Sequence, residues 1–358
     1  MKRSLVLAPL FVLSFAAFAQ TDAVISEIKP TDGPSHGGTP VVIIGTGFQR
    51  EVDCILPCPT TVSFGGIEVP VKLASPTSVI AIAPAHEPGP VDLTVNIAGK
   101  APATKTAAFV FLPGKEDDYE RVLLPIYLES AVGGAFGSRW KTDLWMRNNG
   151  VEPVKLGAWP CASEVCADEF PMTYPFEGGR SLRNLPALGS NDGNPSRMLY
   201  VERELASQVA FSLRFADVSR ASLDGGVEMP VIRQSEMLGG PAQLFDVPLG
   251  STFRVLLRIY EVAYPKSTFR VTVYPQSETD EALVYSAELT ASSSSSAEEF
   301  RPKAGYTVLD ITGLLRDANS WPSSARIEIT PLTPGSRFWA FASITNNDTQ
   351  VVTLVTPQ

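Results

Sequence analysis

The residues that most often carry catalysis are scarce in this chain of 358 residues. There are only two histidines, and both His36 and His86 lie in stretches rich in glycine and proline, which are typical of exposed turns. A Ser-His-Asp triad needs a histidine that is held by a carboxylate and faces an activated serine. Neither histidine has such a setting, so we expect no serine-hydrolase chemistry.

Paired carboxylates are the second catalytic option, because a glycosidase needs only two of them. Four acids, Asp143, Asp168, Glu169 and Glu177, fall in one region, but acids at this density are typical of a solvated surface and nothing singles out a pair. A glycan-active enzyme is therefore the least favoured interpretation.

Calcium is the metal that two acidic stretches suggest. KEDD (115–118) and SNDGNPS (190–196) carry the oxygen ligands that calcium prefers. Neither has the spacing of an EF-hand, and both are more typical of plain turns. We predict a non-enzymatic protein with no cofactor and no resident metal, and calcium binding stays open.

The four cysteines form two local pairs, Cys54 with Cys58 and Cys161 with Cys166. An even number at short spacing in an exported chain favours two small disulfide loops. The alternative is a four-cysteine metal site, which would require two distant pairs to meet, and neither pair has the two-residue spacing usual for zinc. We expect disulfides.

The strongest signal for binding is aromatic. Residues alternate between the two faces of a strand, and the stretch WKTDLWMR divides accordingly. The apolar face carries Trp140, Thr142, Leu144 and Met146, and the opposite face carries Lys141, Asp143, Trp145 and Arg147. Trp145 is therefore expected to lie among charges on an outward face.

A second tryptophan is expected on the same face, from the strand that returns after Asn149-Gly150. There Val154, Leu156 and Ala158 would face inward, and Lys155, Gly157 and Trp159 outward. For the inward faces of both strands to lie on the same side of one sheet, the loop around Asn149-Gly150 must contain an odd number of residues, or there must be a bulge near Pro153. The candidate ligand-binding set is then Trp145, Trp159, Lys141, Asp143 and Lys155. Such a face would suit sugar stacking, but the interpretation we favour is packing on a neighbouring module.

The elements that must position these residues are short strands. Thirty prolines and 27 glycines separate β-branched and aromatic runs, a pattern typical of an all-β sandwich or barrel. A chain of this length is too long for one sandwich of ~100 residues, so several modules are expected.

The N-terminus predicts export. Lys2 and Arg3 precede the short apolar run LVLAPLFVLSFAAF, and small residues lead to a cleavage site after Ala19. No later stretch is long and apolar enough to span a membrane. We expect a secreted protein in the periplasm, outside the cell or at its surface.

The charge of the chain argues against nucleic acid. The formal charge is −9, and loss of Lys2 and Arg3 leaves 27 basic against 38 acidic residues, near −11. A protein that binds phosphate backbones needs a basic face, and no basic run is present.

Residues 23–112 resemble a known module. From Val24 onward the chain carries I-x-x-I-x-P, G-P-x-x-G-G-T, a strand ending in G-x-G-F, V-x-F-G-G and G-x-V-D-L-T-V, in that order. This order resembles the IPT/TIG domain, which implies an immunoglobulin-like sandwich. Gly45 and Gly47 could also suggest a dinucleotide-binding loop, but such a loop needs a third glycine and a following helix, and the sequence has neither. The two glycines are therefore expected to allow backbone conformations that other residues would not.

After an acidic linker (113–119), the remainder contains an internal repeat. GSRWKTDLWM from Gly137 aligns with GSTFRVLLRI from Gly250, and three further pairs of segments follow in the same order. Such order favours duplication. We predict two related antiparallel β-sandwiches at 120–238 and 241–358, which resemble uncharacterised exported proteins of environmental bacteria.

The predicted function is non-enzymatic binding in the envelope or outside the cell, in adhesion or polysaccharide recognition. The alternative is a structural envelope component that assembles with partner proteins through its sandwich faces. The ligand and the oligomeric state do not follow from the sequence, because a fold alone does not specify a ligand.

Overall fold

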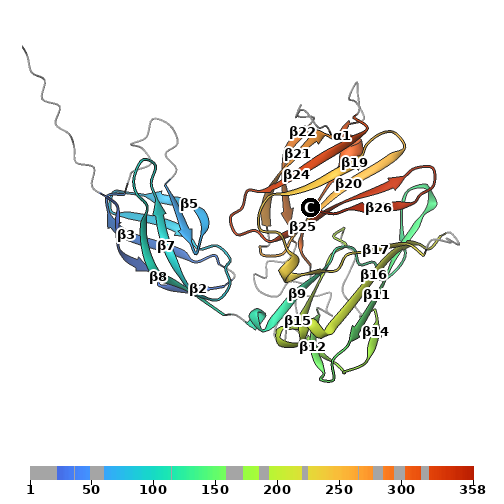
Figure 1. Ribbon diagram of the computed structural model, residues 1–358, viewed down its shortest axis with the longest axis horizontal. Helices are drawn as coiled ribbons and strands as arrows, with labels where there is room; N and C mark the ends of the chain where they lie inside the picture. The colour runs from blue at the N-terminus through green and yellow to red at the C-terminus, as the bar shows by residue number, and fades with distance from the viewer. Residues whose placement is uncertain are drawn as a thin grey trace, which may run out of the picture.

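The computed structural model describes residues 22–35, 37–48, 60–113, 115–158, 172–184, 193–219, 225–264, 266–276, 285–293, 303–315 and 322–358. The predicted leader, His36, Trp159 and all four cysteines lie outside these residues. The described chain is all-β, as predicted, and forms three units (Figure 1). Its one α-helix, α1 (Ile311–Leu315), is short, and no described helix is long and apolar enough to cross a membrane.

The N-terminal unit is a continuous run of eight paired strands that folds over its own core. The strand order is β1-β3-β6-β5-β4-β7-β8-β2, with only β2 and β8 parallel. The strands are β1 (Val24–Lys29), β2 (Asp32–Pro34), β3 (Pro40–Thr46), β4 (Thr61–Phe64), β5 (Ile67–Ala74), β6 (Ser78–Ile82), β7 (Gly89–Asn96) and β8 (Ala103–Leu112). Phe64, Phe109 and Phe111 meet edge to face in the core.

Gly45 and Gly47 serve the backbone in this unit. A Cβ on Gly45 would lie 2.1 Å from the carbonyl oxygen of Val24 on the neighbouring strand. Gly47 has a φ of +76°, which side chains rarely allow. Both glycines therefore permit the close return of β3 past β1.

The second unit is a sandwich of two sheets with a shared apolar core. One sheet has the order β13-β12-β15-β9-β18, and the other has β10-β11-β16-β17 with β14 also paired to β11. The first sheet comprises β9 (Tyr119–Leu124), β12 (Val154–Ala158), β13 (Met172–Phe176), β15 (Arg197–Glu202) and β18 (Ile232–Arg233). The second comprises β10 (Val132–Gly133), β11 (Arg139–Asn148), β14 (Ser181–Arg183), β16 (Val209–Asp217) and β17 (Val227–Met229). Short 3-10 turns are η2 (Lys115–Asp118), η3 (Ala135–Gly137), η5 (Arg203–Gln208) and η6 (Gln234–Glu236).

The third unit is an eight-stranded sheet in the order β19-β24-β21-β22-β23-β20-β25-β26. Its strands are β19 (Ala242–Pro248), β20 (Phe253–Glu261), β21 (Lys266–Pro275), β22 (Tyr285–Ser292), β23 (Gly305–Asp310), β24 (Ser324–Pro331), β25 (Phe338–Asn346) and β26 (Val352–Val355). The two halves of this sheet are joined where β22 meets β23, and they enclose a core of aliphatic and aromatic side chains.

The second and third units share one strand plan, which supports the predicted duplication. The order β13-β12-β15-β9 corresponds to β22-β21-β24-β19, and β14-β11-β16-β17 corresponds to β23-β20-β25-β26. Trp140 on β11 pairs with Asp217 on β16, and Phe253 on β20 pairs with Asn346 on β25. Phe253 lies 113 residues after Trp140, and Asn346 lies 129 residues after Asp217. These are the offsets at which the repeated segments align, so corresponding residues pair with each other in both units.

One expectation about the second unit is wrong. The strands β11 and β12 are not neighbours in one sheet but belong to opposite sheets. The turn between them is organised by buried Asn148, whose amide donates to the carbonyl oxygens of Glu152 at 2.8 Å and Phe176 at 2.9 Å. Because the chain crosses between sheets here, both strands face the core without the odd loop or bulge that a shared sheet would require.

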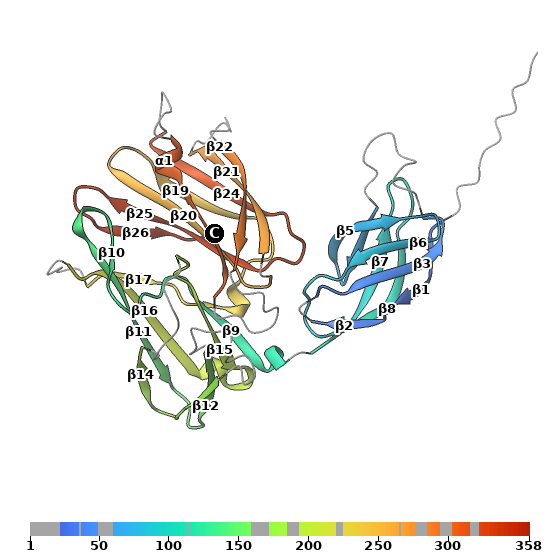
Figure 2. The same cartoon turned by 180° about the vertical axis from the view of Figure 1, so that it is seen from behind.

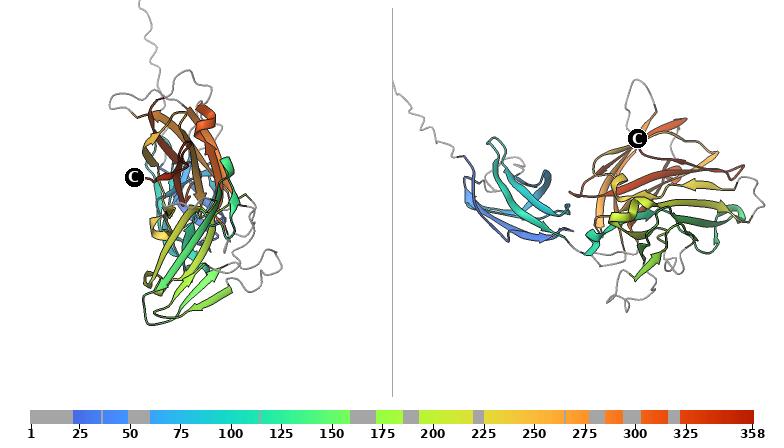
Figure 3. Two further views of the ribbon diagram at one scale, coloured as in Figure 1. Left: turned by 90° about the vertical axis from the view of Figure 1, so that its right-hand side faces the viewer. Right: turned by 60° about the horizontal axis from the view of Figure 1, so that its bottom comes forward.

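The two sandwiches pack closely on each other, and the N-terminal unit sits beside them (Figures 2 and 3). Tyr260, Val262 and Phe341 of the third unit are buried in the same cluster as the core of the second unit. Hydrogen bonds between described residues link the N-terminal unit to the rest of the chain. The backbone N–H of Ala85 donates to the hydroxyl of Tyr264, and Ser35 donates to Asp117 at 2.8 Å.

Candidate functional site

The predicted outward face of β11 is solvent-exposed. We call it the Trp145 face, and it consists of Lys141, Asp143, Trp145 and Arg147 on β11, Ser212 and Arg214 on β16, Arg183 on β14 and Glu228 on β17. Leu144 and Met146 point the other way and are buried, as the alternation predicts. Trp145 remains 46% exposed, so no other unit of the described chain covers this face.

Trp145 is held in place by charged neighbours. Arg183 lies opposite it on β14, with its guanidinium carbon 5.4 Å from the centre of the ring. The same guanidinium donates to both carboxylate oxygens of Asp143, at 2.8 and 2.9 Å. The side chain of Trp145 also contributes to the lowered pKa of the Asp143 carboxyl group. The ring is therefore oriented before any ligand arrives, which lowers the entropic cost of binding.

The carboxyl group of Asp143 is unsuited to acid catalysis. Its hydrogen bonds with Arg183 lower its pKa from the usual value, and the charge of Arg183 adds to that effect. The general acid of a glycosidase needs the opposite shift. Glu177 is an exposed residue, and Asp168 and Glu169 lie outside the described residues.

The rest of the Trp145 face is a flat network of polar groups. Ser212, directly opposite Trp145, donates to Glu228 at 2.8 Å, and Arg214 pairs with Glu228 at 3.3 Å. Donors and acceptors around one aromatic ring can match the hydroxyls and the apolar face of a sugar.

The structure does not bring all the predicted site residues together. Lys155 is exposed on β12, in the other sheet, where its ammonium pairs with Glu202 at 3.1 Å. Lys155 therefore cannot share a face with Trp145. Gly157, expected to point outward, is buried.

Two other expectations concern the N-terminal unit. His86 is half-buried rather than exposed, and its ring stacks on Phe111 with the centroids 4.9 Å apart. Gly33–Gly37 spells G-x-S-x-G, the pattern of a nucleophile elbow, and this match was missed from the sequence. Ser35 is only 5% exposed, donates to Asp117 and follows strand β2, so it does not sit on a strand-to-helix elbow.

In their described residues, 115–118 and 193–196, the two acidic stretches form no metal cluster. Asp117 of KEDD accepts from Ser35, and the amide of Asn194 in SNDGNPS donates to the carbonyl oxygen of Ala304 at 2.9 Å. Within the described ranges, no three His, Cys, Asp or Glu side chains come together as metal ligands.

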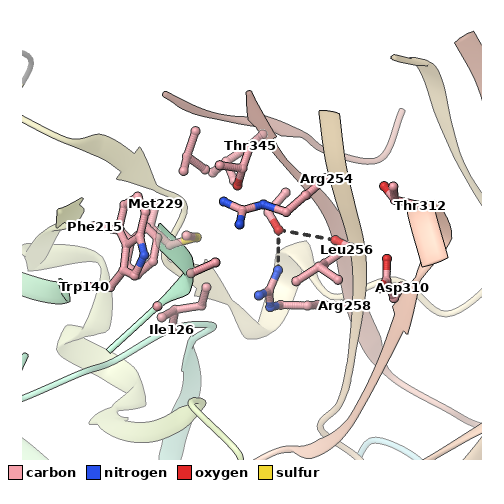
Figure 4. Close-up of a pocket in the computed structure, with 15 residues that line it drawn as sticks. Ile126, Trp140, Phe215, Met229, Arg254, Leu256, Arg258, Asp310, Thr312 and Thr345 are labelled. Atoms are coloured by element: carbon pink, nitrogen blue, oxygen red, sulfur yellow. Dashed lines mark hydrogen bonds between the residues drawn. The ribbon is translucent and has the colours of Figure 1, made fainter. Parts of the chain in front are cut away.

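A cleft between the two sandwiches was not foreseen from the sequence. Its volume is about 430 Å³, and Figure 4 shows its walls. Trp140, Phe215, Met229 and Ile126 of the second unit line one side, and Arg254, Leu256 and Arg258 of the third unit reach in from the other. Trp140 and Phe215 stack with their centroids 4.7 Å apart. One signal in the sequence could have indicated the cleft. The side chains of β20 that point away from its own core include apolar residues as well as arginines, and apolar residues on an outer sheet face predict that another part of the protein covers that face.

Comparison with known proteins identifies the first unit. The family profile described as IPT/TIG domain matches residues 23–111. This segment is an IPT/TIG domain. Its boundaries coincide with the strands β1 to β8, and the rest of the chain lies outside the match. A comparison with curated protein sequences returns no match.

Solved structures resemble the chain only distantly. One is an auxiliary nutrient binding protein from Bacteroides ovatus, with 20% identity and a TM-score of 0.23, covering 38% of this chain and 30% of that one. A gamma-CGTase from alkalophilic Bacillus clarkii has 15% identity and a TM-score of 0.22, covering 60% and 24%. SGBP-B of a mixed-linkage glucan utilization locus of Bacteroides ovatus, in complex with a heptasaccharide, has 11% identity and a TM-score of 0.19, covering 55% and 51%. The chain thus spans about half or less of each of these proteins, and function has to be argued from its own sites.

Proposed function

We propose that this is an exported, non-enzymatic binding protein that recognises polysaccharide through the Trp145 face. The observation that carries the proposal is the exposed, preoriented indole of Trp145 on a flat polar sheet. An aromatic ring gives apolar contact to one side of a sugar, while the carboxylates and guanidinium groups around it bond the hydroxyls.

The third unit, which is the second of the two related sandwiches, provides an internal comparison with the second unit, which is the first sandwich. The positions on β20 and β25 that correspond to the Trp145 face carry Tyr260 and Phe341, both fully buried against the first sandwich. In the first sandwich the same positions carry Arg147 and Ser212, and the face is open. An open aromatic residue among charges, where the related copy buries Tyr260 and Phe341, favours recognition of something outside the chain.

The test is binding of residues 20–358 to a broad panel of soluble polysaccharides. Trp145→Ala should lose about 2 kcal/mol of binding free energy, on the order of 30-fold in Kd, as expected for an aromatic hot spot. Phe245→Ala is the matched control, because Phe245 is an aromatic residue that is 41% exposed on β19, and it should bind as the wild type does.

Two results would decide against the proposal. Binding by the wild type that Trp145→Ala leaves unchanged would move recognition away from this face. No binding to any polysaccharide, together with recovery of the protein cross-linked to an envelope protein through Trp145, would favour the structural alternative.

A further inference from the structure

We infer that the cleft between the two sandwiches is a second binding site, and that it takes a carboxylate-bearing sugar ring, a uronate residue. The inference rests on the proposed function for the choice of a saccharide. The requirement for a negative charge follows from the cleft alone, by the argument below.

The cleft is built from two chemically different walls. The second unit supplies the stacked rings of Trp140 and Phe215, and the third unit supplies Arg254 and Arg258 (Figure 4). A second hollow, also about 430 Å³, shares Trp140, Phe215 and Arg258 with the first. Together they form a space that can hold more than one sugar ring.

The two arginines are not neutralised by the protein. Arg254 donates to the amide oxygen of Gln350 at 3.0 Å and lies 5.1 Å from the ring centre of Phe136. Arg258 donates to the hydroxyl of Ser343 and lies 5.8 Å from the ring centre of Phe341. In the described part of the chain neither arginine forms an ion pair with a carboxylate.

Arg258 also has a donor without a partner. Its Nε is buried and makes no hydrogen bond within the described structure. A buried donor on a charged group is costly unless something accepts from it. The chain has 38 acidic residues against 29 basic ones, so two arginines without a carboxylate partner at one cleft are not explained by an excess of basic residues.

Among the described residues that line the cleft, the one acid is already engaged. Asp310 accepts from the backbone N–H of Gly313 at 2.8 Å, at the start of α1. A ligand carboxylate would complete the pairing of the arginines, and planar guanidinium groups suit it because they can donate two parallel hydrogen bonds.

The other residues that line the cleft indicate what the ligand carries besides its negative charge. Trp140 and Phe215 offer an apolar surface to the face of a ring, and Thr345 offers a hydroxyl on the opposite wall. A simple inorganic anion would leave the aromatic wall unused, and a neutral sugar would leave the arginines unpaired. A uronate uses both walls.

The test is calorimetric titration of residues 20–358 with oligogalacturonate and with the same oligosaccharide as its methyl ester, which keeps the rings and removes the charge. We expect the free acid to bind, the binding to weaken as salt is added, and the ester to bind at least about tenfold more weakly. Arg254→Met and Arg258→Met keep an apolar stem and should each lose about tenfold or more for the acid.

The controls separate this inference from the proposed function. Arg270→Met removes an exposed arginine that pairs with Glu288 on β22, outside the cleft lining, and should bind uronate normally. Phe245→Ala changes an exposed aromatic residue outside both sites and should also keep uronate binding. Trp145→Ala is titrated alongside, to show which of the two sites carries the uronate. Thermal unfolding of each variant checks that it is folded. If Arg258→Met does not fold, the loss of uronate binding in Arg254→Met tests the inference alone.

Three outcomes would overturn the inference. These are equal binding of acid and ester, uronate binding that both cleft variants retain, and no uronate binding by the wild type. If uronate binding is lost only in Trp145→Ala, the cleft is not the site, while the proposed function survives. If neutral polysaccharides fail to bind but uronate binds through Arg254 and Arg258, the Trp145 proposal fails and the cleft stands.

Discussion

The contact between the two sandwiches should contribute strongly to stability, and Phe341→Ala tests this. Phe341 lies on β25 of the second sandwich, is 0% exposed and packs in the core cluster of the first. Its ring stacks on Tyr260, with centroids 6.1 Å apart, and lies under Arg258.

The magnitude follows from these contacts. Removing a fully buried phenylalanine loses about 1.5–3 kcal/mol of burial. The cavity and the lost aromatic pair raise the expected cost to about 3–5 kcal/mol. Because Phe341 joins the two sandwiches, its loss should also separate their unfolding, which we expect to occur as one transition in the wild type.

The assay is urea unfolding, followed by far-ultraviolet circular dichroism and by tryptophan fluorescence. The matched control is Phe245→Ala, which truncates an exposed ring on β19 and should cost less than about 1 kcal/mol. If Phe341→Ala costs no more than Phe245→Ala, this face of the second sandwich is not covered and the argument for the cleft fails with it.

Three further predictions concern single groups. Tyr260→Phe removes a buried hydroxyl that has no hydrogen-bond partner in the described structure, so the melting temperature should stay or rise, and a clear fall would show that the hydroxyl is paired. Arg183→Met removes the main cause of the lowered pKa of Asp143, so an NMR titration should find that pKa higher than in the wild type, and an unchanged value would contradict the ion pair. Burial raises the pKa of Tyr264 to about 12, so the neutral form is favoured on folding. Its contribution to stability is complete below about pH 10, the pKa of an unfolded tyrosine, and is lost as pH rises toward 12. Alkaline unfolding of Tyr264→Phe should lack this component, and identical curves would refute it.

The sequence was sufficient for local structure wherever one side of a strand is buried. The alternation along WKTDLWMR predicted the buried Leu144 and Met146 and the exposed Trp145, because successive side chains of a strand point to opposite faces. The IPT/TIG motifs were equally informative, since Gly45 and Gly47 occupy positions where a side chain would collide or strain the backbone.

The arrangement of strands in sheets could not be obtained in the same way. Alternation shows which residues face a core but not which sheet a strand belongs to. The chain from Asn148 to Val154 reads as a hairpin turn, yet hydrogen bonds from buried Asn148 carry it across to the other sheet. That crossing placed Lys155 away from Trp145.

The sequence could not show which two surfaces meet to form the cleft, for a related physical reason. Its walls come from Trp140 and Phe215 in one unit and from Arg254 and Arg258 in another. Only the packing of whole sandwiches brings these residues together, and no periodicity within either repeat encodes that packing.

The contact between the two copies joins unlike surfaces, and a contact of this kind can in principle continue without limit. The outer sheet face of the second copy meets the first copy, so a further copy could add to the corresponding face of the first and begin a fibre. At the positions of Leu256, Tyr260 and Phe341, however, the first copy has Asp143, Arg147 and Ser212. Polar residues at these positions disfavour the addition of a third copy, much as the polar outer faces of capping repeats do in solenoid proteins. The charges around Trp145 would thus oppose the addition of a further copy at the face that we propose for recognition.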